Sequence, residues 1–173
     1  LKKDISVFNR RDRKLVNERI DSVNSIITSL NKWTFEQVAT IPAPNRVIVS
    51  KHKAMDYYGA AFGFETISLL DVLGDSSSLR PQEINSVLKV LKEGNVKVLF
   101  SEQNPSSKLL KNLSRLSSVP LSKDQIFTDG LMLKGNTVSV AIHNTCTIVN
   151  SLGGQCNLND GEKLENEWNV LIK

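Results

Sequence analysis

Residues that build metal centres, redox motifs and disulfide frameworks are scarce in this sequence. Among its 173 residues there are two cysteines, Cys146 and Cys156, and two histidines, His52 and His143. Two cysteines are too few for a disulfide framework, and their spacing is not that of a CxxC metal or redox motif. In an oxidising compartment they could pair with each other, provided that the chain folds back to bring the two Cα atoms within ~7 Å. The residues alone leave this disulfide open.

Several catalytic and targeting patterns are also missing. The sequence has no G-x-S-x-G turn and no H-E-x-x-H helix, so it offers little support for enzymes that use them. The turn at residues 50–53 lacks the glycines of a nucleotide-binding loop. No stretch reaches the ~18 apolar residues of a membrane span, and no signal peptide opens the chain. Because the chain starts at Leu1 without a methionine, we expect a cut or partial chain, peripheral to a membrane at most.

The composition is that of an ordinary globular protein. Hydrophobic residues make up 40% and charged residues 23% of the chain, which disfavours disorder and fibrous structure. The formal net charge is +4, and six basic residues, including Lys2 and Lys3, lie within the first fourteen positions. Such a cluster could contact nucleic acid or anionic lipid. The start of a solvated helix is the simpler interpretation, and we expect no nucleic-acid partner.

Hydrophobic periodicity predicts a long helix followed by alternating strands and helices. From about residue 12 to residue 32 apolar side chains recur at steps of three and four, and Pro42 and Pro44 end the helix. Short apolar runs at 47–50, 65–70, 96–100 and 124–128 indicate strands, and helical patterns follow each of them. This order predicts an α/β fold, in which a four-stranded, mostly parallel sheet with helices on both faces is preceded by a long backbone helix.

The same pattern divides the chain into three segments. We expect a backbone helix with a proline-containing connection at residues 1–45 and an α/β lobe at residues 46–154. Residues 155–173 form a polar tail until an apolar patch around Trp168, which we expect to dock on the rest of the protein.

Three polar side chains follow the expected strands and are predicted to gather at one edge of the sheet. His52 follows strand 47–50, Glu102 follows strand 96–100, and Asp129 follows strand 124–128. The carboxyl ends of parallel strands meet at one edge, where open α/β sheets bind their ligands. Imidazole and carboxylate suit Zn²⁺ and related divalent ions, but a zinc site takes three or four protein ligands. His143 falls inside the last expected helix, where a surface or packing role is the better interpretation.

Four stretches carry a resemblance to a known family. Between Arg46 and Phe64 lie a strand ending in Ser-x-His, an Ala-x-x-Tyr-Tyr helix and a Gly-Phe exit. Further stretches are Asn95–Glu102 with Ser106–Lys108, Thr128–Leu131 and Gly135–Asn144. Together they resemble the C-terminal lobe, with its backbone helix, of the zinc and manganese receptors of bacterial ABC importers. The similarity runs from about Asp12 to Gly154.

The resemblance implies roles for the residues at the sheet edge. In that family the ion is held between two α/β lobes, and His52 corresponds to the first ligand from the C-terminal lobe and Asp129 to the last. Glu102 corresponds to a residue behind the ligands or at the cleft. Histidine at the first position is the choice typical of zinc, with Mn²⁺ as the alternative. Lys51 and Lys53 depart from the family pattern, and their charges would disfavour a bound dication.

We therefore expect a fragment of a metal-binding receptor that performs no chemistry. The receptor would be periplasmic or anchored as a lipoprotein, and would pass Zn²⁺ or Mn²⁺ to an ABC permease. The N-terminal lobe, which should supply two further histidines, is absent, so this chain alone cannot form the complete four-ligand site, and we expect it to bind the ion weakly or to hold none. A degenerate lobe serving as a structural or protein-interaction subunit is the alternative. An enzyme with His52 as general base and Asp129 orienting it is a third reading, but no nucleophile or oxyanion donor accompanies them.

Overall fold

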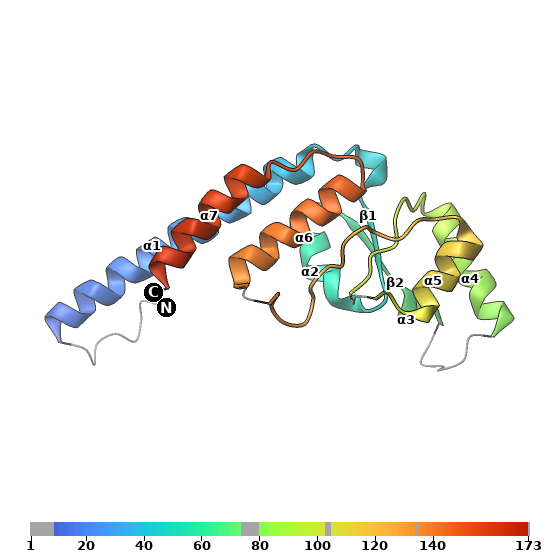
Figure 1. Ribbon diagram of the computed structural model, residues 1–173, viewed down its shortest axis with the longest axis horizontal. Coiled ribbons are helices and arrows are strands. Elements are labelled where there is room, and N and C mark those ends of the chain that lie inside the picture. The colour runs from blue at the N-terminus through green and yellow to red at the C-terminus, as the bar shows by residue number, and fades with distance from the viewer. Residues whose placement is uncertain (1–8, 74–79, 103–104, 134, 173) are drawn as a thin grey trace.

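The first element among the described residues is one long helix that extends beyond the body of the protein (Figure 1). The computed structural model describes residues 9–73, 80–102, 105–133 and 135–172, so Lys2 and Lys3 lie outside the described residues. Helix α1 (Arg10–Ala39) starts at Asn9, whose side chain accepts a hydrogen bond from the backbone N–H of Asp12 at 2.9 Å. It continues past the predicted end near residue 32, because Trp33 and Val38 extend its buried apolar face.

A small parallel sheet follows this helix. Strands β1 (Val47–Ser50) and β2 (Glu65–Ser68) pair in parallel, with Val47 opposite Glu65 and Ser50 opposite Ser68. Between them lie the short 3₁₀ helix η3 (Lys53–Met55) and helix α2 (Asp56–Phe62), which ends at Gly63 in the left-handed conformation (φ 77°). The second strand is two residues shorter than predicted, because Leu69 and Leu70 begin helix α3 (Leu69–Leu73).

The sequence predicts a sheet of four strands. Among the described residues only two of them, β1 and β2, form a sheet. Segment 96–101 runs beside β1, where the N–H of Phe100 donates to the carbonyl of Val49 at 2.9 Å. Segment 119–126 runs beside segment 96–101. The pairing is limited to isolated parallel bridges, one between Val49 and Leu99 and one between Leu99 and Leu121. Pro120 has no N–H to donate to a ladder. At residues 124–128 no strand forms, because the N–H and the carbonyl of Phe127 pair with the side chain of Asn144 and not with a neighbouring strand.

Helices cover both faces of this sheet, as predicted (Figure 1). Alternate side chains of β1 point to opposite faces: Ile48 joins a core with α2 and α6 (Thr137–Ser151), whereas Val47 and Val49 join a core with α3, α4 (Pro81–Glu93) and α5 (Lys108–Ser117). In the first core, burial raises the pKa of Tyr58 to about 12. Among the described residues, none of the helices combines the length and apolarity that crossing a membrane requires.

The tail forms a further helix that packs on the rest of the protein. Helix α6 ends at Ser151, and the chain reverses through Gly153 (φ 86°) and Gly154. The reversal brings Cys156 back to Cys146, and the two form a disulfide with a Cα–Cα distance of 5.2 Å. Helix α7 (Leu158–Leu171) then runs back along α1 and contacts α6 (Figure 1).

Candidate metal centre

His52 stands at the carboxyl end of β1, two residues after the strand. Its backbone is extended (φ −108°, ψ 167°), and helix η3 starts at the next residue. The buried hydroxyl of Ser50 donates to the carbonyl of His52 at 2.8 Å. This bond fixes the turn between strand and helix, so the imidazole is held at the edge of the sheet with 49% of its side chain exposed.

Glu102 holds His52 through two separate hydrogen bonds. One carboxylate oxygen accepts from the backbone N–H of His52 at 3.0 Å, and the other lies 2.7 Å from the ring nitrogen Nδ1. The hydroxyl of Thr128 donates to that second oxygen at 3.5 Å. The Glu102 side chain is only 10% exposed, so the carboxylate is shielded from water while the imidazole is accessible.

This arrangement determines which ring nitrogen can bind a ligand. In the neutral tautomer that carries its proton on Nδ1, this nitrogen donates to the carboxylate and Nε2 keeps a lone pair that can bind a metal ion. Within the described part of the chain no hydrogen bond reaches Nε2. A histidine whose other nitrogen donates to a carboxylate is the form in which imidazole binds metal ions in proteins, because the carboxylate fixes the ring and raises its basicity.

Asp129 lies in the exposed bend that follows Thr128, which itself contacts Glu102. The structure thus brings His52, Glu102 and Thr128 together, and Asp129 is the residue that follows Thr128 in the chain. No group of three histidine, cysteine, aspartate or glutamate side chains that could hold a metal ion occurs among the residues that the structure describes.

The lysines beside His52 differ in their surroundings. The ammonium of Lys53 lies 3.3 Å from a carboxylate oxygen of Asp71, and both side chains are more than half exposed. Asp71 therefore offsets part of the positive charge beside His52, although an exposed pair of this kind contributes little energy. Lys51 makes no ion pair with another described residue, so its charge is not offset in this way.

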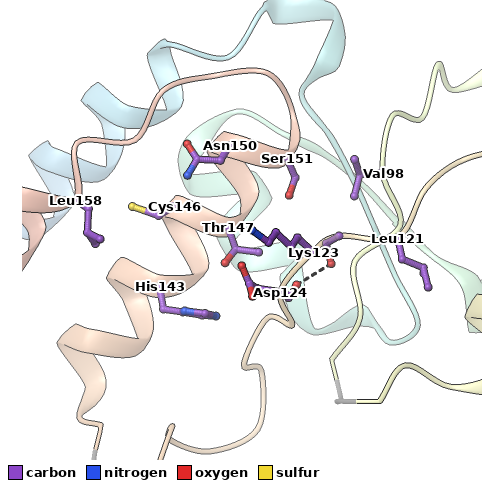
Figure 2. Close-up of a pocket in the computed structure, with 11 residues that line it drawn as sticks. Val98, Leu121, Lys123, Asp124, His143, Cys146, Thr147, Asn150, Ser151 and Leu158 are labelled. Carbon is purple, nitrogen blue, oxygen red and sulfur yellow. Dashed lines mark hydrogen bonds between the residues drawn. The ribbon is translucent and has the colours of Figure 1, made fainter.

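His143 lines a different surface pocket, whose lining includes neither His52 nor Glu102 (Figure 2). Its Nε2 lies 2.9 Å from the carbonyl oxygen of Gln125, and its ring meets the edge of Phe127 at a centroid distance of 5.3 Å. The pocket, of about 550 Å³, has residues of α6 on one side and Lys123 and Asp124 on the other. His143 therefore fastens segment 124–128 to α6, which is a packing role.

The contact residues of His52 were only partly accessible from sequence. The resemblance implies a place for Glu102 behind the ligands or at the cleft, and the structure shows that it contacts both the ring and the backbone of His52. Thr128 was not singled out. Thr128 is the last residue of the predicted strand 124–128 and immediately precedes Asp129. This position at the carboxyl end of a strand is the sequence signal that points to it.

Comparisons with known proteins agree on one family. Residues 2–151 match the sequence profile of a family described as zinc-uptake complex component A, periplasmic. The manganese-binding lipoprotein MntA of Halalkalibacterium halodurans is 29% identical over 130 residues, covering 73% of this chain and 43% of MntA. The metal ABC transporter substrate-binding lipoprotein SloC of Streptococcus mutans is 21% identical over 133 residues, covering 77% of this chain and 43% of SloC.

A solved structure shares the fold. The periplasmic zinc-binding protein TroA of Treponema pallidum superposes with a TM-score of 0.67 at 20% identity, covering 81% of this chain and 53% of TroA. At this identity the superposition shows the fold alone. The chain spans about half the length of these three proteins.

Proposed function

The chain belongs to the zinc-uptake complex component A family, and on this premise we propose that it forms the backbone helix and C-terminal lobe of a receptor for a divalent metal ion. The receptor binds Zn²⁺, with Mn²⁺ as the alternative, and delivers it to an ABC permease. The ion is cargo, and the protein performs no chemistry on it. An extracytoplasmic location fits the family description and the disulfide, since disulfides persist in oxidising compartments.

The observation that carries this proposal is the contact between His52 and Glu102. The carboxylate holds the proton on Nδ1 and leaves the exposed Nε2 as a donor for the ion. Asp129 adds a carboxylate oxygen from the neighbouring bend. A nitrogen and an oxygen donor suit both zinc and manganese, and histidine in place of an all-oxygen set favours zinc.

These two donors make half of a site, and the remaining ligands come from a second lobe. A structural zinc site uses four protein ligands and a catalytic one usually three. The described residues gather no third donor around His52 and Asp129. In the proposed receptor the ion is therefore bound where this edge of the sheet faces another lobe, and binding draws the two lobes together.

Titration of Zn²⁺ and Mn²⁺ into the receptor that contains this lobe, in competition with a chelating dye, tests the proposal. We expect His52→Ala to weaken Zn²⁺ binding at least a hundredfold, and Asp129→Ala to weaken it at least tenfold. Glu65→Ala is the control, because this exposed carboxylate lies at the amino end of β2, opposite Val47 and away from His52, and it should leave the affinity unchanged. Unchanged affinity in the His52 variant would refute the assignment and favour a lobe that serves as an interaction subunit without metal.

A further inference from the structure

We propose that residues 155–171, here named the C-terminal clasp, lock helix α1 onto the lobe so that both move as one rigid body. The clasp lies beyond the family match, which ends at residue 151. It consists of a three-residue connection and helix α7. It runs along α1 as far as the half of that helix that projects beyond the body of the protein (Figure 1). The proposal concerns α1 and the clasp only and does not depend on ion binding.

The connection at residues 155–157 is held by side chains of α1. The N–H of Asn157 donates to the amide oxygen of Gln37 at 2.7 Å, and its carbonyl accepts from the indole N–H of Trp33 at 3.2 Å. The N–H of Gln155 donates to the hydroxyl of Thr40 at 2.9 Å. Gln37 and Trp33 are 6% and 5% exposed. Because Gln37 and Trp33 are buried, leaving their polar atoms unpaired would be costly, and their bonds hold the base of the clasp to α1.

An apolar layer continues the contact along α7. Trp33 of α1 and Ile142 of α6 pack with Leu164 and Trp168 of α7 in a single cluster. Gly161 makes the close approach possible: a Cβ atom at this position would lie 2.9 Å from Ile142 Cγ2 and 3.0 Å from Trp33 Cζ2. The three helices therefore meet at a point where any side chain at position 161 would push α7 outwards.

The far end of the clasp is tied to both partner helices. The side-chain amide of Asn136, at the start of α6, donates to the side-chain oxygen of Asn169 at 3.0 Å. The guanidinium of Arg19, in the first half of α1, donates to the carbonyl of Leu171. Helix α7 thus bridges α1 and α6 along its length, and its end reaches a part of α1 that lies away from the sheet (Figure 1).

The disulfide makes the bridge permanent. Cys146 belongs to α6, and Cys156 is the residue immediately before Asn157, which α1 holds. The backbone N–H of Cys156 also donates to the side chain of Asn150 on α6 at 3.1 Å. The covalent link therefore fixes the start of α7 beside α6, while the bond from Arg19 to Leu171 holds its other end at α1.

The clasp matters because α1 is otherwise secured over only part of its length. Its buried residues all lie between Ile26 and Val38, and none of residues 10–25 is buried. A helix held at one end can pivot about that end. With α7 in place, the first half of α1 is braced against α6, and we infer that bending within a receptor occurs beyond the clasp rather than at the junction of α1 with the lobe.

Distance measurement between spin labels at Asn24→Cys on α1 and Lys111→Cys on α5 tests this inference. Both residues are exposed, and the native cysteines are joined and do not react with the label. We expect a narrow distance distribution in the otherwise unchanged chain. The Cys146→Ser/Cys156→Ser variant should broaden it at least twofold, and amide hydrogen exchange in α7 should accelerate at least tenfold while exchange in α4 stays the same.

A second variant separates the clasp from the disulfide. Gly161→Leu keeps both cysteines and improves helix propensity, so a broadened distribution would come from the displaced α7 alone. Asn166→Ala on the exposed face of α7 is the control and should match the unchanged chain. An unaltered distribution in either the serine pair or Gly161→Leu, with α7 exchange accelerated, would overturn the inference, because α1 would then hold its direction without the clasp.

Discussion

The orientation of His52 depends on the charge and shape of a single carboxylate. Glu102 contacts the backbone N–H with one oxygen and Nδ1 with the other, so both the position of the ring and the location of its proton are set by one side chain. Thr128 donates to the same carboxylate and connects it to the bend that carries Asp129. A change at position 102 therefore acts on the proposed ligands without removing either of them.

Replacement of Glu102 by Gln tests this dependence at the level of one proton. If the amide oxygen of the new side chain accepts from the backbone N–H of His52, its NH₂ group faces Nδ1. Nδ1 must then accept a hydrogen bond, so the ring proton moves to Nε2. That tautomer cannot bind a metal ion through Nε2, and we expect the Zn²⁺ affinity of the receptor to fall by about 10–100-fold. Competition titration measures the affinity, and the ¹⁵N chemical shifts of the imidazole report the tautomer.

The matched control for this substitution is Glu65→Gln, which makes the same chemical change at an exposed position on β2. It should alter neither quantity. If Glu102→Gln retained both the affinity and the Nδ1–H tautomer of the unchanged protein, the positioning role of Glu102 would be wrong.

At the level of elements, the sequence predicts a strand at residues 124–128, but a side chain holds this segment instead. The side-chain oxygen of Asn144 on α6 accepts from the N–H of Phe127 at 2.8 Å, and its NH₂ donates to the carbonyl of Phe127 at 2.7 Å. One amide group thus substitutes for both partners that a neighbouring strand would supply. It also sets the position of Thr128 and Asp129, the next two residues.

We expect Asn144→Ala to destabilise the protein and to weaken the site together. Asn144 is 9% exposed, and its removal leaves the N–H and carbonyl of Phe127 without partners in a partly buried place, which should cost about 2–4 kcal/mol in the free energy of unfolding. Urea unfolding measures this cost, and Zn²⁺ titration under native conditions should show reduced affinity. Asn24→Ala, at an exposed position on α1, is the control for stability. A loss below about 0.5 kcal/mol would show that segment 124–128 is held by other contacts.

These elements also show how far the sequence could predict the fold. Apolar periodicity identified α1, α4, α5 and α6, because each buries one face and the pattern repeats over many residues. A short apolar run such as 124–128 does not reveal whether its backbone pairs with a strand or with a side chain. Asn144 lies 17 residues further along the chain, and only the folded structure brings it to Phe127.

The candidate site was predictable to a similar extent. Parallel topology correctly indicated that residues after different strands would meet, and His52 and Glu102 do so across 50 positions of sequence. The contact geometry could not be derived, since it depends on the turn that Ser50 fixes and on where segment 119–126 ends. The disulfide was equally open in sequence, because whether Cys156 reaches Cys146 depends on the reversal at Gly153 and Gly154.

At the scale of the whole molecule, the packed cores of the described residues differ from the proposed site in how far their parts are assembled. The sheet has helices on both faces, and the clasp secures α1 to α6. The donors at the sheet edge, in contrast, gather in no group of three among the described residues. Because folding and ligand completion are separate in this arrangement, the lobe can be stable whether or not an ion is present.

This separation predicts that the 173-residue chain by itself binds Zn²⁺ weakly but at the expected place. Two protein donors in place of about four should reduce the affinity by at least about a thousandfold relative to a two-lobed receptor of the family. Titration of the chain alone against a weak chelating dye should show binding that His52→Ala abolishes and Glu65→Ala preserves. Circular dichroism with and without Zn²⁺ should be the same, because the lobe does not need the ion to fold. Tight binding that survives His52→Ala would show that the ion is held elsewhere on this chain, and the edge of the sheet would lose its role.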